Sequence, residues 1–212
     1  MGRTKKLNRP HGLGGTDAIR LVDGKWKELW DEKTGKTKRE DLSDILPVQL
    51  GIFTEKFNRQ WYTKTTSQRV VNMNKVWTHP EIDYIYGSLD GVVNGKVWEA
   101  KHTNPFSKED TILERYYPQL QHYMFVTGFR KAILSVLFGT MRYKIYEVDY
   151  DEKFTETLLK ACALFWYHVE NNIVPPDFMD FKTIEGINNA EDVIEVFGIE
   201  ISDVAGLQRT LN

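Results

Sequence analysis

The stretch 87-GSLDGVVNGKVWEAKHT-103 decides the fold, because it contains a two-residue turn between valine-rich runs. The turn is Asn94-Gly95. A type I′ turn requires positive φ angles at both central residues, and Asn followed by Gly adopts them at low cost. We therefore expect a β-hairpin whose two strands are joined at these residues.

Counting outward from the turn predicts which strand residues lie opposite each other. The predicted pairs are Val93 with Lys96, Val92 with Val97, Gly91 with Trp98, Asp90 with Glu99, Leu89 with Ala100 and Ser88 with Lys101. Side chains alternate along a strand, so the two acids and Lys101 are expected on one face. The same face is predicted to carry Ser88, Val92 and Val97, and the other face Leu89, Trp98 and Ala100.

The two opposed carboxylates favour a metal site at the hairpin. Like charges placed opposite each other destabilise a sheet. A Mg²⁺ ion, typically held by one or two carboxylates with water and phosphate oxygens, would relieve that repulsion. The alternative is a surface hairpin with mixed charges. Apolar residues on both faces argue against it, because an unpaired acidic pair in a partly buried sheet is costly.

LDG followed by WEAK resembles the core of the PD-(D/E)xK nucleases. In this resemblance Asp90 and Glu99 are the two acids and Lys101 is the lysine, while Leu89 replaces the signature proline. The resemblance implies one or two Mg²⁺ or Mn²⁺ ions held by the acids, with the backbone carbonyl of Ala100 as a further ligand. The lysine would orient or deprotonate the water that attacks a phosphodiester.

A glycine-rich turn near the N-terminus is similar to the opening of one nuclease branch, the YqaJ-type viral recombinases, the family of the phage lambda exonuclease. Arg9 precedes the turn 14-GGTD-17. We expect Thr16 or Asp17 to cap a helix that begins near Ala18. The resemblance implies that Arg9 and Thr16 bind the phosphate of a terminal nucleotide.

Two predicted helices carry further residues that match this family. Gly51 and Glu55 fit a G-x-x-x-E pattern on a helix over residues 47–62, where the resemblance implies that Glu55 is a third metal-binding carboxylate. On a helix over 111–126, Gln119 and Tyr123 resemble the Q-x-x-x-Y motif of the RecB-like and lambda-type branch. There Gln119 would contact metal-bound water or the nucleotide, and Tyr123 with Ser88 would support the bound DNA. The first helix is expected to bury an apolar stripe of Leu46, Leu50, Phe53, Phe57 and Trp61.

The composition predicts one domain with appendages. The chain has 212 residues, 41% of them hydrophobic and 27% charged, which can bury one core. Its net charge of −2 argues against a generally basic DNA-coating protein. The single cysteine, Cys162, is expected to be a buried core thiol and allows no intrachain disulfide. The lack of a signal peptide or a spanning apolar stretch predicts a cytosolic location, in the host cytoplasm if the protein is viral.

The chain is expected to have three parts. These are a basic N-terminal arm over 1–10, a nuclease domain over 11–176 and a tail over 177–212 with a short helix over 190–197, packed on the domain or on a neighbouring subunit. The basic loop that contains Lys33, Lys36, Lys38 and Arg39 is either a DNA contact or a solvated linker. Strands are predicted over 69–77, 82–89, 131–139 and 143–150, and Asp151 is predicted to cap a long helix. This order predicts an α/β fold of the restriction-endonuclease type, with a central mixed sheet flanked by helices.

These features predict a metal-dependent DNA exonuclease of the lambda/YqaJ type. The resemblance implies 5′-to-3′ digestion of double-stranded DNA ends to 5′-mononucleotides, a ring-shaped trimer, and a single-strand annealing protein as partner. Two alternatives are an endonuclease on the same fold and a DNA-binding module without catalysis. A phosphate site at Thr16 favours an end-binding enzyme over the first. Intact Asp90, Glu99 and Lys101 argue against the second.

Overall fold

The predicted hairpin belongs to a four-stranded mixed sheet in the computed structural model, which describes residues 10–204 and 207–211. The strand order is β3-β4-β5-β6. Its members are β3 (Gly91–Val93), β4 (Lys96–Thr103), β5 (Lys131–Phe138) and β6 (Arg142–Asp149). The β3–β4 and β5–β6 pairs are antiparallel, and β4–β5 is parallel. The predicted mixed sheet is therefore confirmed.

The turn of the hairpin has the predicted geometry. Asn94 and Gly95 both adopt positive φ angles, 48° and 73°. The three pairs nearest the turn follow the predicted register, up to Gly91 opposite Trp98. Local turn chemistry thus determines the start of the ladder.

The register predicted beyond Gly91 is wrong. The chain bends at Asp90, so Ser88 and Leu89 do not pair with β4. They belong instead to β2 (Tyr86–Leu89). This strand pairs antiparallel with β1 (Lys75–Thr78) in a separate two-stranded sheet. At the bend, Asp90 Oδ2 accepts a hydrogen bond from the backbone N–H of Ala100. A side-chain contact therefore replaces the predicted backbone pairing.

The strands before the hairpin are shorter than predicted. Asn72 and Asn74 both have a φ angle of 54°. A strand cannot continue through such left-handed residues, so β1 begins only at Lys75. Ile82 likewise lies in a turn, where its carbonyl accepts a hydrogen bond from the Ile85 N–H.

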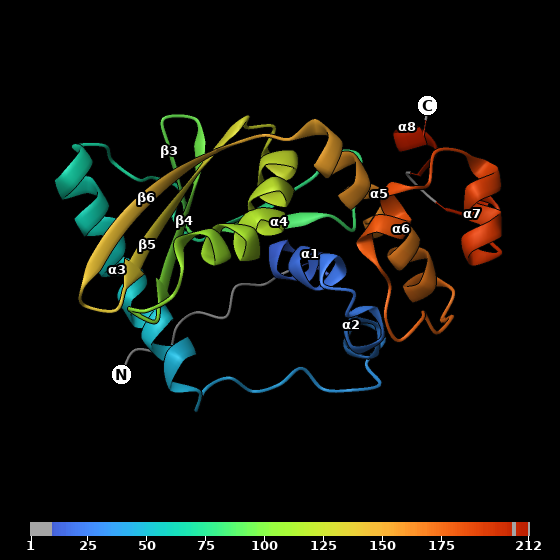
Figure 1. Ribbon diagram of the computed structural model, residues 1–212, viewed down its shortest axis with the longest axis horizontal. Helices are drawn as coiled ribbons and strands as arrows, with labels where there is room; N and C mark the ends of the chain where they lie inside the picture. The colour runs from blue at the N-terminus through green and yellow to red at the C-terminus, as the bar shows by residue number, and fades with distance from the viewer. Residues whose placement is uncertain (1–9, 205–206, 212) are drawn as a thin grey trace.

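Helices cover both faces of the four-stranded sheet (Figure 1). The α4 helix (Glu109–Thr127) makes the crossover between the parallel strands β4 and β5 and packs on one face with α1 (Gly15–Val22) against it. The α3 helix (Leu46–Thr66) contacts β4 and β5 and lies at the opposite side of the sheet. The hairpin is therefore enclosed between α3 and α4, the two helices predicted to carry site residues.

An apolar cluster surrounds the α5 helix (Glu152–Glu170). As predicted, Asp151 caps this helix, because its side chain accepts a hydrogen bond from the Phe154 N–H. Cys162 is buried in this cluster. Around α5 lie α2 (Trp26–Lys33), α6 (Phe181–Glu185), α7 (Ala190–Phe197), the 3₁₀ turn η1 (Ile201–Asp203) and α8 (Leu207–Leu211). In Figure 1, α6, α7 and α8 lie at the end of the molecule opposite α3. Within the described ranges, no helix combines the length and apolarity needed to cross a membrane.

The predicted orientation of α3 is wrong. Its apolar stripe faces solvent, with Leu46 74% exposed and Phe53 81% exposed. Asn58 and Tyr62 are the buried residues of this helix. The reason is that the sheet offers polar groups to α3 at this position, the carbonyls of Lys101 and Ser135. Polar pairing therefore decides which face of α3 points inward.

Candidate active site

Asp90, Glu99 and Lys101 converge at the bend between β2 and β3. Lys101 Nζ lies 2.7 Å from Glu99 Oε1, and Asp90 Oδ2 accepts from the Ala100 N–H at 3.0 Å. Glu99 is only 2% exposed, and its second oxygen, Oε2, has no hydrogen-bond partner among the described residues. The bend thus keeps Asp90 beside β4 although the predicted strand pairing is absent.

Glu55 reaches the same cluster from α3. Burial and, after it, the charge on Asp90 raise its pKa to about 7, while the charges on Arg59 and Lys101 act in the opposite sense. Arg59 lies one turn further along α3, with its Nη1 3.8 Å from Glu55 Oε1. The charges of Glu55 and Asp90 therefore act on each other, and the role of Glu55 as a third metal-binding carboxylate stays a prediction.

Burial also raises the pKa of Glu99, and the Asp90 charge adds to the effect. Burial alone would lower the pKa of Lys101, but the charges on Glu99 and Asp90 outweigh burial and raise it. Lys101 is therefore an ammonium group that donates to Glu99. It also lies 4.5 Å from the centre of the Tyr116 ring. This arrangement suits a lysine that donates hydrogen bonds better than one that removes a proton.

Gln119 and Tyr123 connect α4 to the acidic cluster. The Gln119 amide donates to Glu99 Oε1 at 3.0 Å and to the Tyr123 hydroxyl at 2.9 Å. Both side chains are buried. The spacing of four residues places them on one side of α4. Gln119 of the predicted Q-x-x-x-Y pair therefore contacts Glu99, and Tyr123 contacts Gln119.

The donor set fits a hard divalent cation. Within residues 10–204 and 207–211, no three His, Cys, Asp or Glu side chains form a group that could hold a metal ion. However, carboxylate oxygens are the donors that Mg²⁺ prefers, and Mg²⁺ commonly uses only one or two of them with water. The unpaired, buried Glu99 Oε2 is costly to leave without a partner. A cation bound by Glu99 and Asp90 would satisfy that oxygen.

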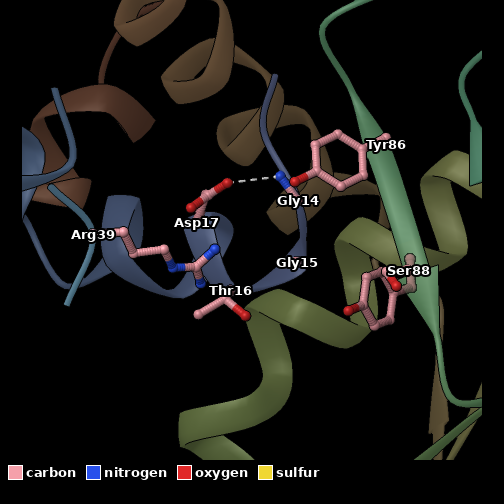
Figure 2. A pocket seen from close by; sticks show the side chains of 8 residues that line it. Gly14, Gly15, Thr16, Asp17, Arg39, Tyr86 and Ser88 are labelled. Carbon is pink, nitrogen blue, oxygen red and sulfur yellow. Dashed lines mark hydrogen bonds between the residues drawn. The ribbon is translucent and has the colours of Figure 1, made fainter. Parts of the chain in front are cut away.

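A polar pocket of about 30 Å³ lies next to this cluster, where α1, β2 and α4 meet (Figure 2). It is lined by Gly14, Gly15, Thr16, Asp17, Arg39, Tyr86, Ser88 and Tyr123. Thr16 and Ser88, which the sequence assigned to phosphate binding, are therefore in one pocket. Tyr123 belongs to this pocket and also accepts from Gln119. Tyr123 thus connects the pocket, through Gln119, with Glu99 in the acidic cluster.

Asp17 does not give this pocket an unpaired negative charge. Its Oδ2 accepts from the Gly14 N–H at 2.9 Å and from Lys33 Nζ at 2.7 Å. Lys33 also donates to the Gly12 carbonyl. The helix therefore begins at Gly15 rather than near Ala18, and Asp17 accepts from within the first turn. Lys33, which we had placed in a basic loop, is the counter-ion of Asp17 at the end of α2.

Arg39 is a pocket residue that the sequence placed only in a basic loop, as either a DNA contact or part of a solvated linker. Figure 2 shows its guanidinium group beside Thr16, with Ser88 across the pocket. Of the residues that the structure describes, none forms a hydrogen bond or an ion pair with this group. Arg9, predicted to be the phosphate-binding arginine, lies outside the described residues. The only sequence signal for Arg39 was its position in the basic loop.

Two solved exonuclease structures have the same fold. The crystal structure of LHK-Exo, an alkaline exonuclease from Laribacter hongkongensis, in complex with dAMP matches with a TM-score of 0.63 and 20% identity, covering 77% of this chain and 90% of that one. A phage-related exonuclease from Haemophilus somnus 129PT matches with a TM-score of 0.62 and 10% identity, covering 76% and 95%. The fold is that of phage-type alkaline exonucleases.

The family follows from the sequence comparison. Residues 6–130 match the YqaJ-like viral recombinase domain. The uncharacterized protein YqaJ of Bacillus subtilis strain 168 is 30% identical over 172 residues, which cover 76% of this chain and 54% of the relative. The chain belongs to the YqaJ-like viral recombinase family. It spans about half the length of that curated relative.

Proposed function

We propose that this protein is a metal-dependent exonuclease that digests double-stranded DNA from its ends. The observation that carries the proposal is the convergence of Asp90, Glu99 and Lys101 with Gln119 around a buried carboxylate oxygen that lacks a partner. The fold shared with two exonucleases agrees with it. A DNA phosphodiester is the substrate that such a site would cleave.

Asp90, Glu99 and Glu55 would hold one or two Mg²⁺ or Mn²⁺ ions, with the Ala100 carbonyl as a further ligand. Such an ion would polarise the scissile phosphate and lower the pKa of bound water. Lys101 would donate a hydrogen bond to the attacking water or to a phosphate oxygen. Gln119 would hold Glu99 in place and present its amide to the nucleotide. The contacts of Lys101 and Gln119 with Glu99 support these roles.

The polar pocket would receive the phosphate of a terminal nucleotide. Thr16 and Ser88 offer hydroxyl groups, and the N–H groups of Gly15 and Thr16 lie at the start of α1, where no preceding turn supplies an acceptor. Arg39 would supply the positive charge, together with Arg9. Binding of a terminal phosphate next to the acidic cluster would distinguish an exonuclease, which works from DNA ends, from an endonuclease. LHK-Exo, which has the same fold, was crystallised with dAMP, a nucleotide with one phosphate.

We further propose 5′-to-3′ polarity with release of 5′-mononucleotides, because the pocket suits a 5′-phosphate and lies beside the acids. A ring-shaped trimer around DNA and a single-strand annealing protein as partner complete the proposal. Both come from family membership, since a viral recombinase must pass resected DNA to a strand-pairing step. The closed ring would supply the basic surface that a chain with a net charge of −2 lacks on average.

The test is digestion of linear duplex DNA labelled at either the 5′ or the 3′ end. Reactions would contain Mg²⁺, EDTA, or Mg²⁺ with the Lys101→Ala variant, and a covalently closed circular duplex would serve as a second substrate. We expect labelled mononucleotides only from the 5′-labelled duplex with Mg²⁺ and wild-type protein. Cleavage of the closed circle would instead indicate an endonuclease. No product with any divalent metal would refute catalysis.

A further inference from the structure

A buried amide joins the α3 helix to two strands of the sheet. Asn58 Nδ2 donates to the carbonyl of Lys101 at 3.3 Å and to the carbonyl of Ser135 at 2.8 Å. The Ser135 hydroxyl donates back to Asn58 Oδ1 at 2.6 Å and also contacts the Tyr143 hydroxyl at 2.8 Å. Asn58 is only 1% exposed. One side chain on α3 thus binds β4 and β5 together.

Asn58 makes the most buried of the polar contacts between α3 and the sheet; Thr54 Oγ1 adds a partly buried contact with His102 Nδ1 at 3.1 Å. Its apolar stripe points to solvent, and Tyr62, packed edge-on against Trp98, is its one fully buried large side chain within the described residues. Apolar packing tolerates sliding and rotation, because it is not directional. Hydrogen bonds to two different strands are directional and allow one orientation. Asn58, which bonds to both β4 and β5, is therefore the main directional contact that orients α3 on the sheet.

We infer that Asn58 is a positioning residue, whose amide places the Glu55 carboxylate in the acidic cluster. Residues three apart lie on the same side of a helix, so fixing Asn58 also fixes the direction in which Glu55 points. One acceptor of the amide is the carbonyl of Lys101, which belongs to the cluster itself. The distance between Glu55 and the other acids is thus set by a hydrogen bond within the site. The inference rests on the proposed function in taking Glu55 as a metal-binding group.

The test is the affinity of Mn²⁺ for the protein without DNA, measured by titration calorimetry. Partners that orient metal ligands typically contribute about 10–100-fold to affinity. We therefore expect Asn58→Ala to weaken Mn²⁺ binding about tenfold, a change at the low end of that range. Glu55→Gln should weaken it as well. In the double variant the second substitution should add no further loss, because Asn58 acts through Glu55.

The matched control is Tyr143→Phe, which removes a hydroxyl at the far end of the same network and leaves both carbonyl contacts of Asn58 in place. It should lower thermal stability without changing Mn²⁺ affinity. If Asn58→Ala does not fold, Asn58→Ser, which keeps one hydrogen-bonding group, replaces it. Additive losses in the double variant, or unchanged affinity in the Asn58 variants, would overturn the inference. Absence of Mn²⁺ binding by the wild-type protein would instead refute the proposed function.

Discussion

Asp90 is the charge that, after burial, contributes most to raising the pKa of both Glu55 and Glu99 at the candidate site. We predict that Asp90→Asn raises the melting temperature in EDTA by a few degrees. The substitution removes the repulsion, while the amide oxygen can still accept from the Ala100 N–H. Differential scanning calorimetry at pH 8 measures the effect.

The same variant should gain less stability than the wild type when Mg²⁺ is added. A ligand stabilises the folded state by an amount that rises with the logarithm of the ratio of ligand concentration to Kd, so weaker Mg²⁺ binding gives a smaller gain. An Asp90→Asn protein that is no more stable than the wild type in EDTA would show that the acids do not repel one another. Equal gains with Mg²⁺ would remove Asp90 from the proposed ligands.

Arg39 should determine the preference for a 5′-phosphate. Hydrogen bonds to charged groups contribute about 1.5–3 kcal/mol, so we predict that Arg39→Ala reduces the rate ratio between 5′-phosphorylated and 5′-hydroxyl duplex ends about tenfold or more. The rates are measured on otherwise identical duplexes. Lys38→Ala removes a charge from the same loop, outside the pocket, and should leave the ratio unchanged. An unchanged ratio in Arg39→Ala would exclude this role.

Single residues also mark what the sequence could not reveal. Lys33 pairs with Asp17 across 16 positions, and Arg39 joins a pocket whose other members lie on three separate elements. Contacts of this kind depend on tertiary packing, and charge patterns alone do not identify the partner. Asp90, Glu99, Lys101 and Gln119 were proposed because their spacing matches a known motif; the fold brings Lys101 and Gln119 against Glu99, although the strand pairing assumed for Asp90 was wrong.

At the scale of elements, the hairpin and α3 differ in how well sequence reasoning describes them. The turn depends on the local φ preferences of Asn94 and Gly95, so it was predicted. The periodicity of α3 identified the residues that share a face of the helix. It does not show which of the helix faces packs against the sheet. The sheet presents carbonyl groups that Asn58 pairs with, and this preference outweighs the apolar stripe.

The exposed stripe of α3 should contribute nothing to stability. We predict that Phe53→Ala changes the free energy of unfolding by less than about 0.5 kcal/mol, as for ordinary surface positions. Tyr62→Ala, on the buried side of the same helix, should cost about 3–5 kcal/mol, the range for large aromatic side chains. Urea denaturation of both variants gives the comparison. A large loss in Phe53→Ala would mean that the stripe packs on something within the native protein.

The contact between α1 and α4 depends on Gly15. A Cβ atom there would lie 2.5 Å from Tyr123 Cε1 and 2.8 Å from Gln119 Cγ, and both side chains are buried and hydrogen-bonded. We predict that Gly15→Ala destabilises the protein by about 1–3 kcal/mol, as overpacking does. Urea denaturation measures the loss.

Gly51→Ala is the matched control, since Gly51 lies within α3 and a Cβ there meets nothing within 4 Å. Alanine in a helix interior is favoured over glycine by about 0.5–1 kcal/mol, so this variant should be more stable than the wild type. Equal effects of the two substitutions would show that α1 and α4 are not closely packed at Gly15.

At the scale of the whole molecule, the acidic cluster should make stability depend on pH. Burial and Asp90 raise the pKa of Glu55 from 4.5 to about 7, so between these values the folded protein holds a proton that the unfolded chain releases. Its stabilising contribution is complete below about pH 4.5 and is lost as the pH rises through about 7. Glu99 acts in the same direction.

We therefore predict that the melting temperature in EDTA falls less steeply between pH 5 and 8 for Glu55→Gln than for the wild type. Burial lowers the pKa of His122, so this histidine makes the folded protein less stable as the pH falls toward 5, which is the opposite of the effect of Glu55. The difference between variant and wild type isolates Glu55, because His122 is present in both. Parallel curves would show that Glu55 has an ordinary pKa.

The bend after β2 has a consequence for the products. Ser88 lines the phosphate pocket and Asp90 belongs to the acidic cluster, and residues two apart on an extended chain are separated by about 7 Å. If the pocket holds the strand terminus while the acids act on the next linkage, this short piece of backbone defines a fixed step length. Every cycle would then remove an increment of the same size, whatever the base sequence, because covalent geometry sets it.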